Sequence, residues 1–139
     1  MGEFVLDASV AISWCFPGDP SEDTPYSRRI LNELLVRDAL VPGIWAFEIA
    51  NNIFVSHRKH RITEPQVAEY LDLLKALSIR VESQTLWRDV DLQSVARRWD
   101  IAAYDAAYLD LALRKGIPLA TSDEPLKRIA MRAGVTILG

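Results

Sequence analysis

Four acidic residues occupy comparable places in this sequence, each within or at the edge of an apolar segment. Asp7 follows the run FVL, Glu48 lies in IWAFEIANN, Asp105 in AYDAAYLDLA and Asp123 in PLATSDEPL. An ionised carboxylate in apolar surroundings is costly unless a cation balances its charge. The four acids therefore predict a divalent cation, which carboxylate oxygens bind well. A cation held in this way indicates phosphoryl-transfer chemistry, because the metal activates water and neutralises charge on a phosphate.

Three of these acids also have a structural explanation, which the sequence alone leaves open. Asp7 and Asp123 each precede a helical pattern and could cap it with their side chains. Asp105 falls in the first turn of a helix, where a negative charge suits the helix dipole. Its neighbours three, four and seven residues later are Tyr, Leu and Ala, so we expect its side chain to follow an inward stripe.

Glu48 is harder to explain as a structural residue. From residue 44 to residue 55 the helical pattern is apolar almost all round, which predicts a buried helix. Its polar members, Glu48, Asn51 and Asn52, have the spacing of one helical stripe. A polar stripe on a buried helix needs partners, which either a structural hydrogen-bond network or a lined active site supplies. We favour the active site.

Polar neighbours could assist these acids. Ser9 could donate a hydrogen bond to the carboxylate of Asp7, or it could simply begin a helix. Thr121 and Ser122 could cap the following helix or orient a water molecule. Asp110 lies on another face of its helix, and we expect it to be solvated or to support the site from behind its ligands.

Short apolar runs alternate with helical patterns along the chain. We expect strands at residues 4–6, 39–41, 79–82, 117–120 and 135–138. We expect helices at residues 8–15, 26–37, 44–60, 63–77, 89–99, 102–115 and 125–133. This alternation indicates an α/β protein with a parallel sheet covered on both faces. Sites in such sheets gather beyond the carboxyl ends of the strands, where this pattern places Asp7 and Asp123.

Composition narrows the class of protein. The 139 residues fit one domain, and 50% hydrophobic content excludes a disordered chain. A net charge of −3 excludes a globally basic nucleic-acid binder, so a polynucleotide site must be a local patch. The single cysteine, Cys15, allows no internal disulfide, which fits a reducing cytoplasm. We expect no signal peptide and no membrane span, because no apolar run approaches about 20 residues.

Three stretches together resemble the PIN-domain ribonucleases, and most closely the VapC-type toxins of type II toxin–antitoxin pairs. They are FVLDASVAISW, VPGIWAFEIANN and AYDAAYLDLALRKGIPLATSDEPL, which occur in this order and span nearly the whole chain. The resemblance implies a three-layer α/β/α fold with a central, mostly parallel sheet. It implies that residues 1–139 form a single PIN-like domain.

The resemblance also implies a function and a site. It implies endonucleolytic cleavage of RNA by an acidic Mg²⁺ or Mn²⁺ site. Carried over by motif position, the metal-binding and catalytic acids fall on Asp7, Glu48, Asp105 and Asp123. The polar positions beside them fall on Ser9, Asn51 and Thr121. A cytoplasmic homodimer and a small antitoxin that inserts near the acids are implied as partners.

RNA must reach an acidic pocket past cationic side chains. The first candidates are Arg58, Lys59 and Arg61, followed by Arg28, Arg29, Lys127 and Arg128. Each could equally be ordinary solvated surface charge. Aromatic side chains beyond the needs of a small core could serve a dimer or antitoxin interface, although each could equally pack in the core: Trp14, Phe16, Trp45, Phe47 and Phe54.

Two other functions compete with the nuclease. A catalytically silent interaction module could keep this fold, although intact acids argue against it. An aspartyl phosphatase would use Asp7 as nucleophile, but it needs a second Asp where Ser9 stands. A phosphorylated receiver domain would need its acceptor Asp after a middle strand, and the chain offers no good match.

Overall fold

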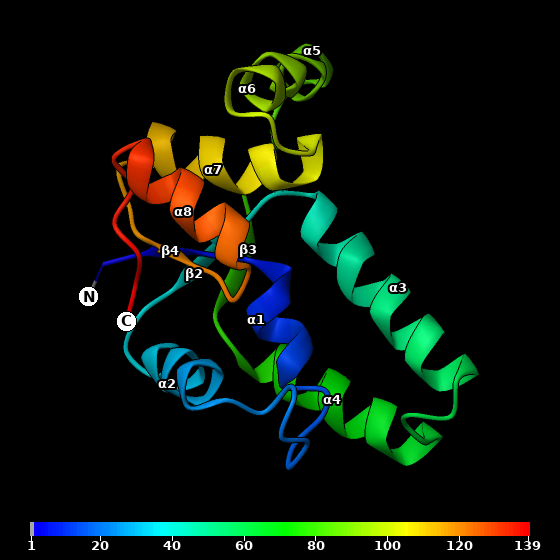
Figure 1. Ribbon diagram of the computed structural model, residues 1–139. Coiled ribbons are helices and arrows are strands. Elements are labelled where there is room, and N and C mark those ends of the chain that lie inside the picture. Colours follow the sequence, from blue (N-terminus) through cyan, green and yellow to red (C-terminus); the bar gives the residue numbers. More distant parts are fainter. Residues whose placement is uncertain (1) are drawn as a thin grey trace.

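In the computed structural model, which describes residues 2–139, a parallel sheet lies at the centre of the molecule (Figure 1). Its strands are β1 (Phe4–Leu6), β2 (Ala39–Val41), β3 (Ile79–Val81) and β4 (Leu119–Ala120), in the order β3-β2-β1-β4. All three strand pairings are parallel. Met1, which belongs to the expected domain 1–139, lies outside the described residues.

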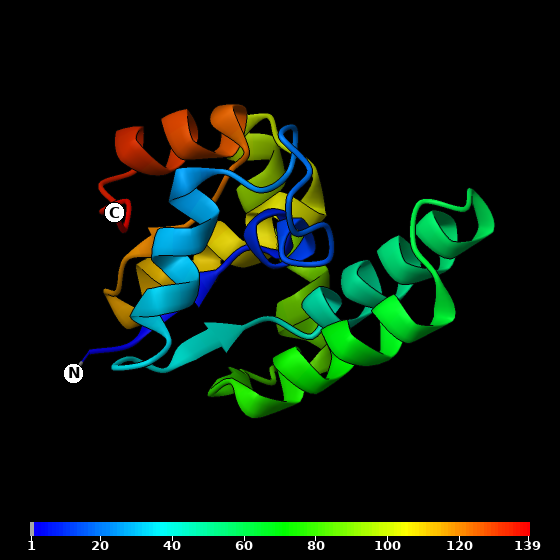
Figure 2. The same ribbon diagram turned by 90° about the horizontal axis from the view of Figure 1, so that it is seen from below.

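Helices cover both faces of this sheet. They are α1 (Ala8–Ser13), α2 (Pro25–Glu33), α3 (Ile44–Arg58), α4 (Glu64–Ala76), α5 (Leu86–Val90), α6 (Leu92–Trp99), α7 (Ala103–Lys115) and α8 (Glu124–Arg132). Figure 1 shows α7 and α8 on one side of the sheet and α2 and α4 on the other. Figure 1 and Figure 2 show α3 and α4 projecting away from the strands and approaching each other at the turn that joins them. The expected three-layer α/β/α fold is confirmed.

The central strand β1 carries the first acid to the carboxyl edge of the sheet. Its three residues have no exposed surface, as their uninterrupted apolar pattern predicts. Leu6 stands beside Ala120 in the register of β1 and β4, so the next residues, Asp7 and Thr121, are neighbours. The backbone N–H of Asp7 donates to the carbonyl of Ala120 at 2.9 Å. Two segments far apart in sequence therefore leave the sheet together.

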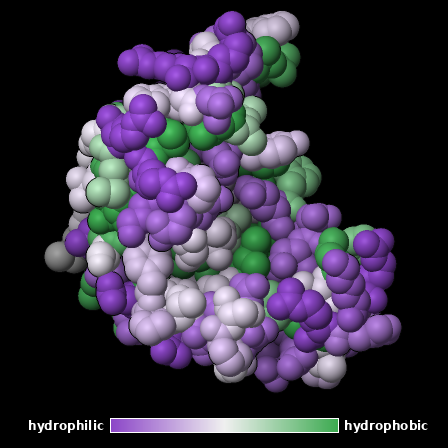
Figure 3. Space-filling model, in the orientation of Figure 1, coloured by the Kyte–Doolittle hydropathy of each residue, from purple (hydrophilic) through white to green (hydrophobic). Residues whose placement is uncertain are grey.

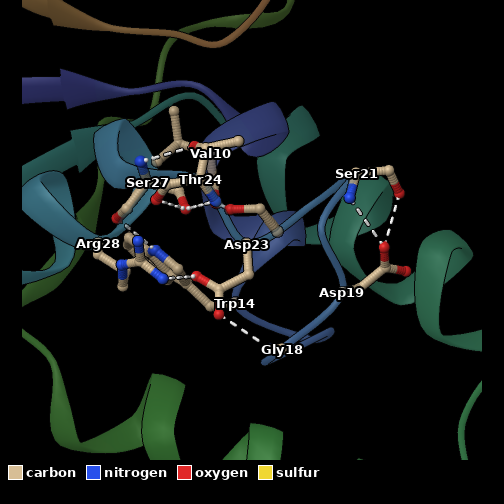
Figure 4. Close-up of polar contacts among 10 residues, drawn as sticks. Val10, Trp14, Gly18, Asp19, Ser21, Asp23, Thr24, Ser27 and Arg28 are labelled. Atoms are coloured by element: carbon tan, nitrogen blue, oxygen red, sulfur yellow. Dashed lines mark hydrogen bonds and ion pairs between the residues drawn. The ribbon is translucent and has the colours of Figure 1, made fainter.

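The connection between α1 and α2 is held by its own side chains (Figure 4). Thr24 and Ser27 form a reciprocal capping box at the start of α2, with both hydrogen bonds at 3.1 Å. The indole N–H of Trp14 donates to the Ser27 carbonyl at 2.8 Å. Asp23 pairs with Arg28 at 3.1 Å. These contacts fix α2 against the helix that follows Asp7.

The single helix expected at residues 89–99 is wrong, because the structure forms two helices there. The side chain of Thr85 accepts a hydrogen bond from the Arg88 N–H, which starts α5 earlier than expected. The chain turns at Asp91, where Ser94 donates its hydroxyl to the Asp91 carbonyl at 2.8 Å. The segment whose apolar spacing suggested one helix therefore forms α5 and α6, which are separated at Asp91.

The strand expected at residues 135–138 is also wrong, since only one isolated bridge forms there, between Leu119 and Ile137. Two carbonyls beyond this bridge bind side chains of α2. The Leu138 carbonyl accepts from the Tyr26 hydroxyl, and the Gly139 carbonyl accepts from Arg29, both at 2.8 Å. The final residues therefore fasten α2 to the edge of the sheet instead of extending β4.

The prediction that α3 is buried all round is wrong. Trp45 and Ile49 are buried, but the side chains of Phe47 and Phe54 are 73% and 58% exposed. One face of α3 packs against α1, while the helix projects from the sheet and leaves its other face open. Of the five aromatic residues singled out above, Trp14, Phe16 and Trp45 belong to the core.

Within residues 2–139, no helix is both long enough and apolar enough to cross a membrane. Cys15 is a buried free thiol that packs in the hydrophobic core.

Candidate functional site

Asp7 is held by hydroxyl groups and does not cap a helix. It occupies the N-cap position of α1, yet its side chain makes no capping hydrogen bond, so the capping explanation is wrong for this residue. Ser9 and Thr121 each donate a hydroxyl hydrogen bond to its Oδ2 atom at 2.7 Å. The side chain is only 5% exposed. A buried carboxylate with two donors on one oxygen keeps the other oxygen for a further partner.

The hydroxyl donors are themselves fixed by the loop after β4. The Ser122 N–H donates to the Ser9 hydroxyl oxygen at 3.1 Å, and the Asp123 N–H donates to the Thr121 hydroxyl oxygen at 3.0 Å. Behind them, the Tyr26 hydroxyl accepts from the Thr121 N–H at 3.3 Å. This chain of hydrogen bonds connects α2, through Thr121, to the carboxylate at the end of β1.

Glu48 is positioned by a tyrosine from another helix. The Tyr108 hydroxyl, on α7, donates to Glu48 Oε1 at 2.6 Å, and Tyr108 has no exposed surface. The asparagines of the expected polar stripe behave differently. Asn51 is exposed, whereas Asn52 is half-buried and its oxygen accepts from the Ser56 hydroxyl at 3.3 Å. The Asn52 amide nitrogen is buried without a hydrogen-bond partner among residues 2–139.

The two remaining acids begin helices. Asp123 caps α8, since its Oδ1 accepts from the Leu126 N–H at 2.9 Å, so the capping explanation is confirmed here. Asp105 lies in the first turn of α7 and is half-buried, as expected. The weaker candidate Asp110 is engaged elsewhere, because it pairs with Arg114 at 2.8 Å one turn along α7.

The four acids share one electrostatic environment. Burial raises the pKa of Asp7, and the charge of Asp123 raises it further. Burial also raises the pKa of Glu48, to which the charges of Asp7 and Asp105 add, while the hydrogen bond from Tyr108 opposes the rise. The pKa of Asp105 is raised by burial first and then by the charges of Asp123 and Asp7. Asp7 thus acts electrostatically on Glu48 and Asp105, and Asp123 acts on Asp7 and Asp105.

This donor set suits a divalent cation. The charges that act on Asp7, Glu48 and Asp105 come from other carboxylates, and no Lys or Arg contributes. Converging, mutually repelling oxygen ligands are what Mg²⁺ or Mn²⁺ neutralises. In the part of the chain that the structure describes, no three His, Cys, Asp or Glu side chains are yet close enough to hold a metal ion. The mutual repulsion of the acids is consistent with that spacing.

Five of the seven cationic candidates lie far along α3 from Glu48 or are already engaged. Arg58 and Lys59 are ten and eleven residues beyond Glu48, which is about 15 Å along α3. Arg58 lies over the Phe54 ring at 5.1 Å. Arg61 lies over the Phe16 ring at 4.1 Å and contacts two acids of the α1–α2 loop. The other two on α2 are engaged as well, since Arg28 pairs with Asp23 and Arg29 binds the Gly139 carbonyl.

The sequence pattern did not identify two tyrosines, Tyr108 and Tyr26, as members of this site. Tyr108 was noted only as a neighbour of Asp105, and its spacing three residues later was the available signal. Tyr26 carried no signal at all, because its contacts to Thr121 and Leu138 span 95 and 112 residues.

Comparisons with known proteins agree with this geometry. A protein named Ribonuclease VapC3, from Pyrobaculum aerophilum, is 28% identical over 128 residues, which cover 89% of this chain and 92% of that relative. The crystal structure of PAE2754 from Pyrobaculum aerophilum is similar with a TM-score of 0.66 and 21% identity, covering 93% of this chain and 87% of the other.

The structure of FitAcB from Neisseria gonorrhoeae is similar with a TM-score of 0.54 and 18% identity, covering 98% of this chain and 96% of the other. At these identities the two structures support the fold alone. The family model described as PIN domain matches residues 4–131, a range that contains all four acids. The chain therefore belongs to the PIN domain family.

Proposed function

We propose that this protein is a metal-dependent endoribonuclease that acts as the toxin of a toxin–antitoxin pair in the cytoplasm. The observation that carries the proposal is that the pKa values of Asp7, Glu48 and Asp105 are raised by burial and by the charges of neighbouring acids, Asp123 among them. Membership of the PIN domain family and the likeness to Ribonuclease VapC3 support a nuclease at this site.

Each residue has a distinct task in the proposed mechanism. Asp7, Glu48 and Asp105 would hold Mg²⁺ or Mn²⁺, directly or through water, and Asp123 would complete the set. A divalent metal in such a site lowers the pKa of water and neutralises charge on a phosphate. Ser9 and Thr121 fix the orientation of the Asp7 carboxylate through their hydroxyl hydrogen bonds. Tyr108 does the same for Glu48 through the hydrogen bond from its hydroxyl.

The Asp7→Asn variant tests the proposal. Asparagine keeps the shape and can still accept hydrogen bonds from Ser9 and Thr121, but it removes the charge that would bind metal. We expect Mg²⁺-dependent cleavage of a labelled RNA to fall by at least roughly a hundredfold, with an unchanged circular dichroism spectrum. EDTA should abolish cleavage by the natural protein.

Asp72→Asn serves as the matched control, since Asp72 is exposed on α4. It should cleave RNA as the natural protein does. Full metal-dependent activity in a folded Asp7→Asn protein would refute the site assignment. If the natural protein cleaves no RNA, the alternative function, a catalytically silent PIN-fold interaction module, is supported instead.

The role as a toxin is tested with the same pair of proteins in cells. We expect expression of the natural chain to arrest growth, and expression of Asp7→Asn not to do so. Co-expression of the protein encoded by the neighbouring reading frame should relieve the arrest if that protein is the antitoxin. Sequencing of the cleaved RNA ends then identifies the target.

A homodimer and an antitoxin partner are also proposed. Support comes from the exposed aromatic side chains of Phe47 and Phe54 on α3 and Tyr104 on α7. Phe47 and Tyr104 line a mostly apolar groove of about 420 Å³ between the starts of these helices. An exposed apolar surface of this kind on a small protein indicates a protein contact.

A further inference from the structure

Four arginines on α6 and α8 form no ion pair with any acid among residues 2–139. They are Arg97 and Arg98 at the end of α6 and Arg128 and Arg132 on α8. Ion pairs within those residues involve other cations, such as Arg61 and Arg114. The two segments 97–100 and 124–132 carry five cations and two acids, a net charge of +3, whereas the whole chain carries −3. Positive charge is thus concentrated where little of it is neutralised.

An aromatic ring lies between two of these cations. The guanidinium groups of Arg98 and Arg132 lie over the ring of Trp99, at 5.5 Å and 5.9 Å from its centroid. The contact joins the end of α6 to the last turn of α8. Trp99 is half-buried and packs against the core, so part of the residue remains exposed to solvent. Cationic groups beside an accessible aromatic ring suit a phosphate backbone and its bases.

This surface leads to the acidic site. α8 begins directly after Asp123, and Arg128 and Arg132 are one turn apart on the same stripe of that helix. Arg132 lies nine positions after Asp123, which is about 13 Å along the helix. α8 also packs against α7, the helix that carries Asp105. Figure 3 shows that hydrophilic residues cover much of the surface over α8 and the outer side of α6.

We propose that Arg98, Trp99, Arg128 and Arg132, here called the α6–α8 track, bind the single-stranded RNA that enters the acidic site. The arginines contact phosphates and the indole stacks on a base. This inference rests on the proposed ribonuclease function and names a surface for its substrate. It differs from the expectation that Arg58, Lys59 and Arg61 bind RNA. Arg58 and Lys59 lie at the end of α3 that is far from Glu48, and Arg61 contacts two acids of the α1–α2 loop.

Fluorescence anisotropy with a fluorescein-labelled single-stranded RNA tests this surface, in EDTA so that the RNA stays intact. The triple variant Arg98→Ala, Arg128→Ala, Arg132→Ala should bind at least roughly tenfold more weakly than the natural protein at low salt. Its plot of log affinity against log salt should be shallower by about 2, since each lost phosphate contact contributes about 0.7. Circular dichroism verifies that the variant is folded.

A matched control removes the same charge elsewhere, with Arg58→Ala, Lys59→Ala and Lys75→Ala at exposed positions of α3, α4 and the turn between them. We expect this control to bind RNA nearly as well as the natural protein. Equal binding by the track variant and the natural protein, or a larger loss in the control, overturns the inference. The milder variant Trp99→Leu should weaken binding without changing the salt slope, because stacking involves no charge.

Failure of the inference and failure of the proposed function are distinguishable. A natural protein that neither binds nor cleaves RNA refutes the ribonuclease and with it the track. A natural protein that cleaves RNA while the track variant binds and cleaves equally well refutes the track alone. If the triple arginine variant still binds RNA but no longer binds the protein encoded by the neighbouring reading frame, the surface is a protein interface and the proposal is overturned.

Discussion

The carboxylates of the site are held by donors that differ in strength and position. Asp7 receives two hydroxyl hydrogen bonds on one oxygen, whereas Glu48 receives one from the fully buried phenol of Tyr108. The donor at Glu48 opposes the rise in pKa that burial and the neighbouring acids cause. A tyrosine far from solvent thus helps to keep a glutamate ionised, which is the form that a metal requires.

Replacing Tyr108 by Phe isolates this contribution. The hydrogen bond that lowers the pKa of Glu48 disappears, so the pKa rises and a larger fraction of Glu48 is protonated at mildly acidic pH. We expect the acidic limb of the pH profile of kcat/KM to move to higher pH, with activity near pH 6 reduced about tenfold and activity near pH 8 reduced less.

Tyr104→Phe is the control, because Tyr104 is a largely exposed tyrosine of the same helix. Its pH profile should match that of the natural protein. A profile for Tyr108→Phe that is lowered equally at every pH would show that the hydroxyl acts on structure rather than on the ionisation of Glu48.

Helix α8 begins at an acid that serves structure and chemistry together. Asp123 caps the helix with Oδ1, and its charge raises the pKa of Asp7 and Asp105. The capping task needs only an acceptor oxygen, which Asn also provides. The electrostatic task needs the negative charge. Two substitutions at one position can therefore separate these tasks.

We expect Asp123→Asn to unfold in urea at the same concentration as the natural protein or slightly higher, since the cap remains and repulsion among the acids decreases. Asp123→Ala should lose about 1 kcal/mol of unfolding free energy, because the Leu126 N–H loses its acceptor. Both variants should cleave RNA roughly tenfold or more slowly. If Asp123→Asn cleaves RNA as fast as the natural protein, the role of Asp123 is limited to capping α8.

Element prediction succeeded where the pattern was local and failed where contacts between distant residues mattered. The capping box of α4 needs only Thr63 and Gln66, which are three residues apart, and helix α4 forms where the sequence pattern predicted a helix. The strand expected at 135–138 is reduced to one bridge with Leu119, and its last two carbonyls accept hydrogen bonds from Tyr26 and Arg29 of α2. Those partners lie more than a hundred residues away, and no periodicity of the segment could reveal them.

The folded chain exposes an apolar face on α3 and α7 that does not pack in its hydrophobic core. Phe47 and Phe54 protrude from α3, and the groove beside Phe47 continues to Tyr104 of α7. Because these side chains belong to a helix that projects from the sheet, covering them requires another molecule (Figure 2). A second copy of the chain is the proposed occupant.

Sedimentation equilibrium tests this dimer. The natural protein should have twice the 15.7 kDa mass of the chain, and the double variant Phe47→Ser, Phe54→Ser should have the monomer mass. Leu35→Ser is the control, since Leu35 is 78% exposed beyond the end of α2. That control should remain dimeric. A monomeric natural protein, or a dimeric double variant, would contradict the assignment of this face.

The alternation of strands and helices, the parallel sheet and the positions of the four acids within or beside these elements follow from local pattern, because periodicity and capping act over a few residues. The tertiary structure alone decided what holds those acids. Thr121 reaches Asp7 across 114 residues and Tyr108 reaches Glu48 across 60. It also decided which face of α3 is open and which arginines lack acidic partners. Such contacts depend on how distant elements pack, and no short window of sequence contains that information.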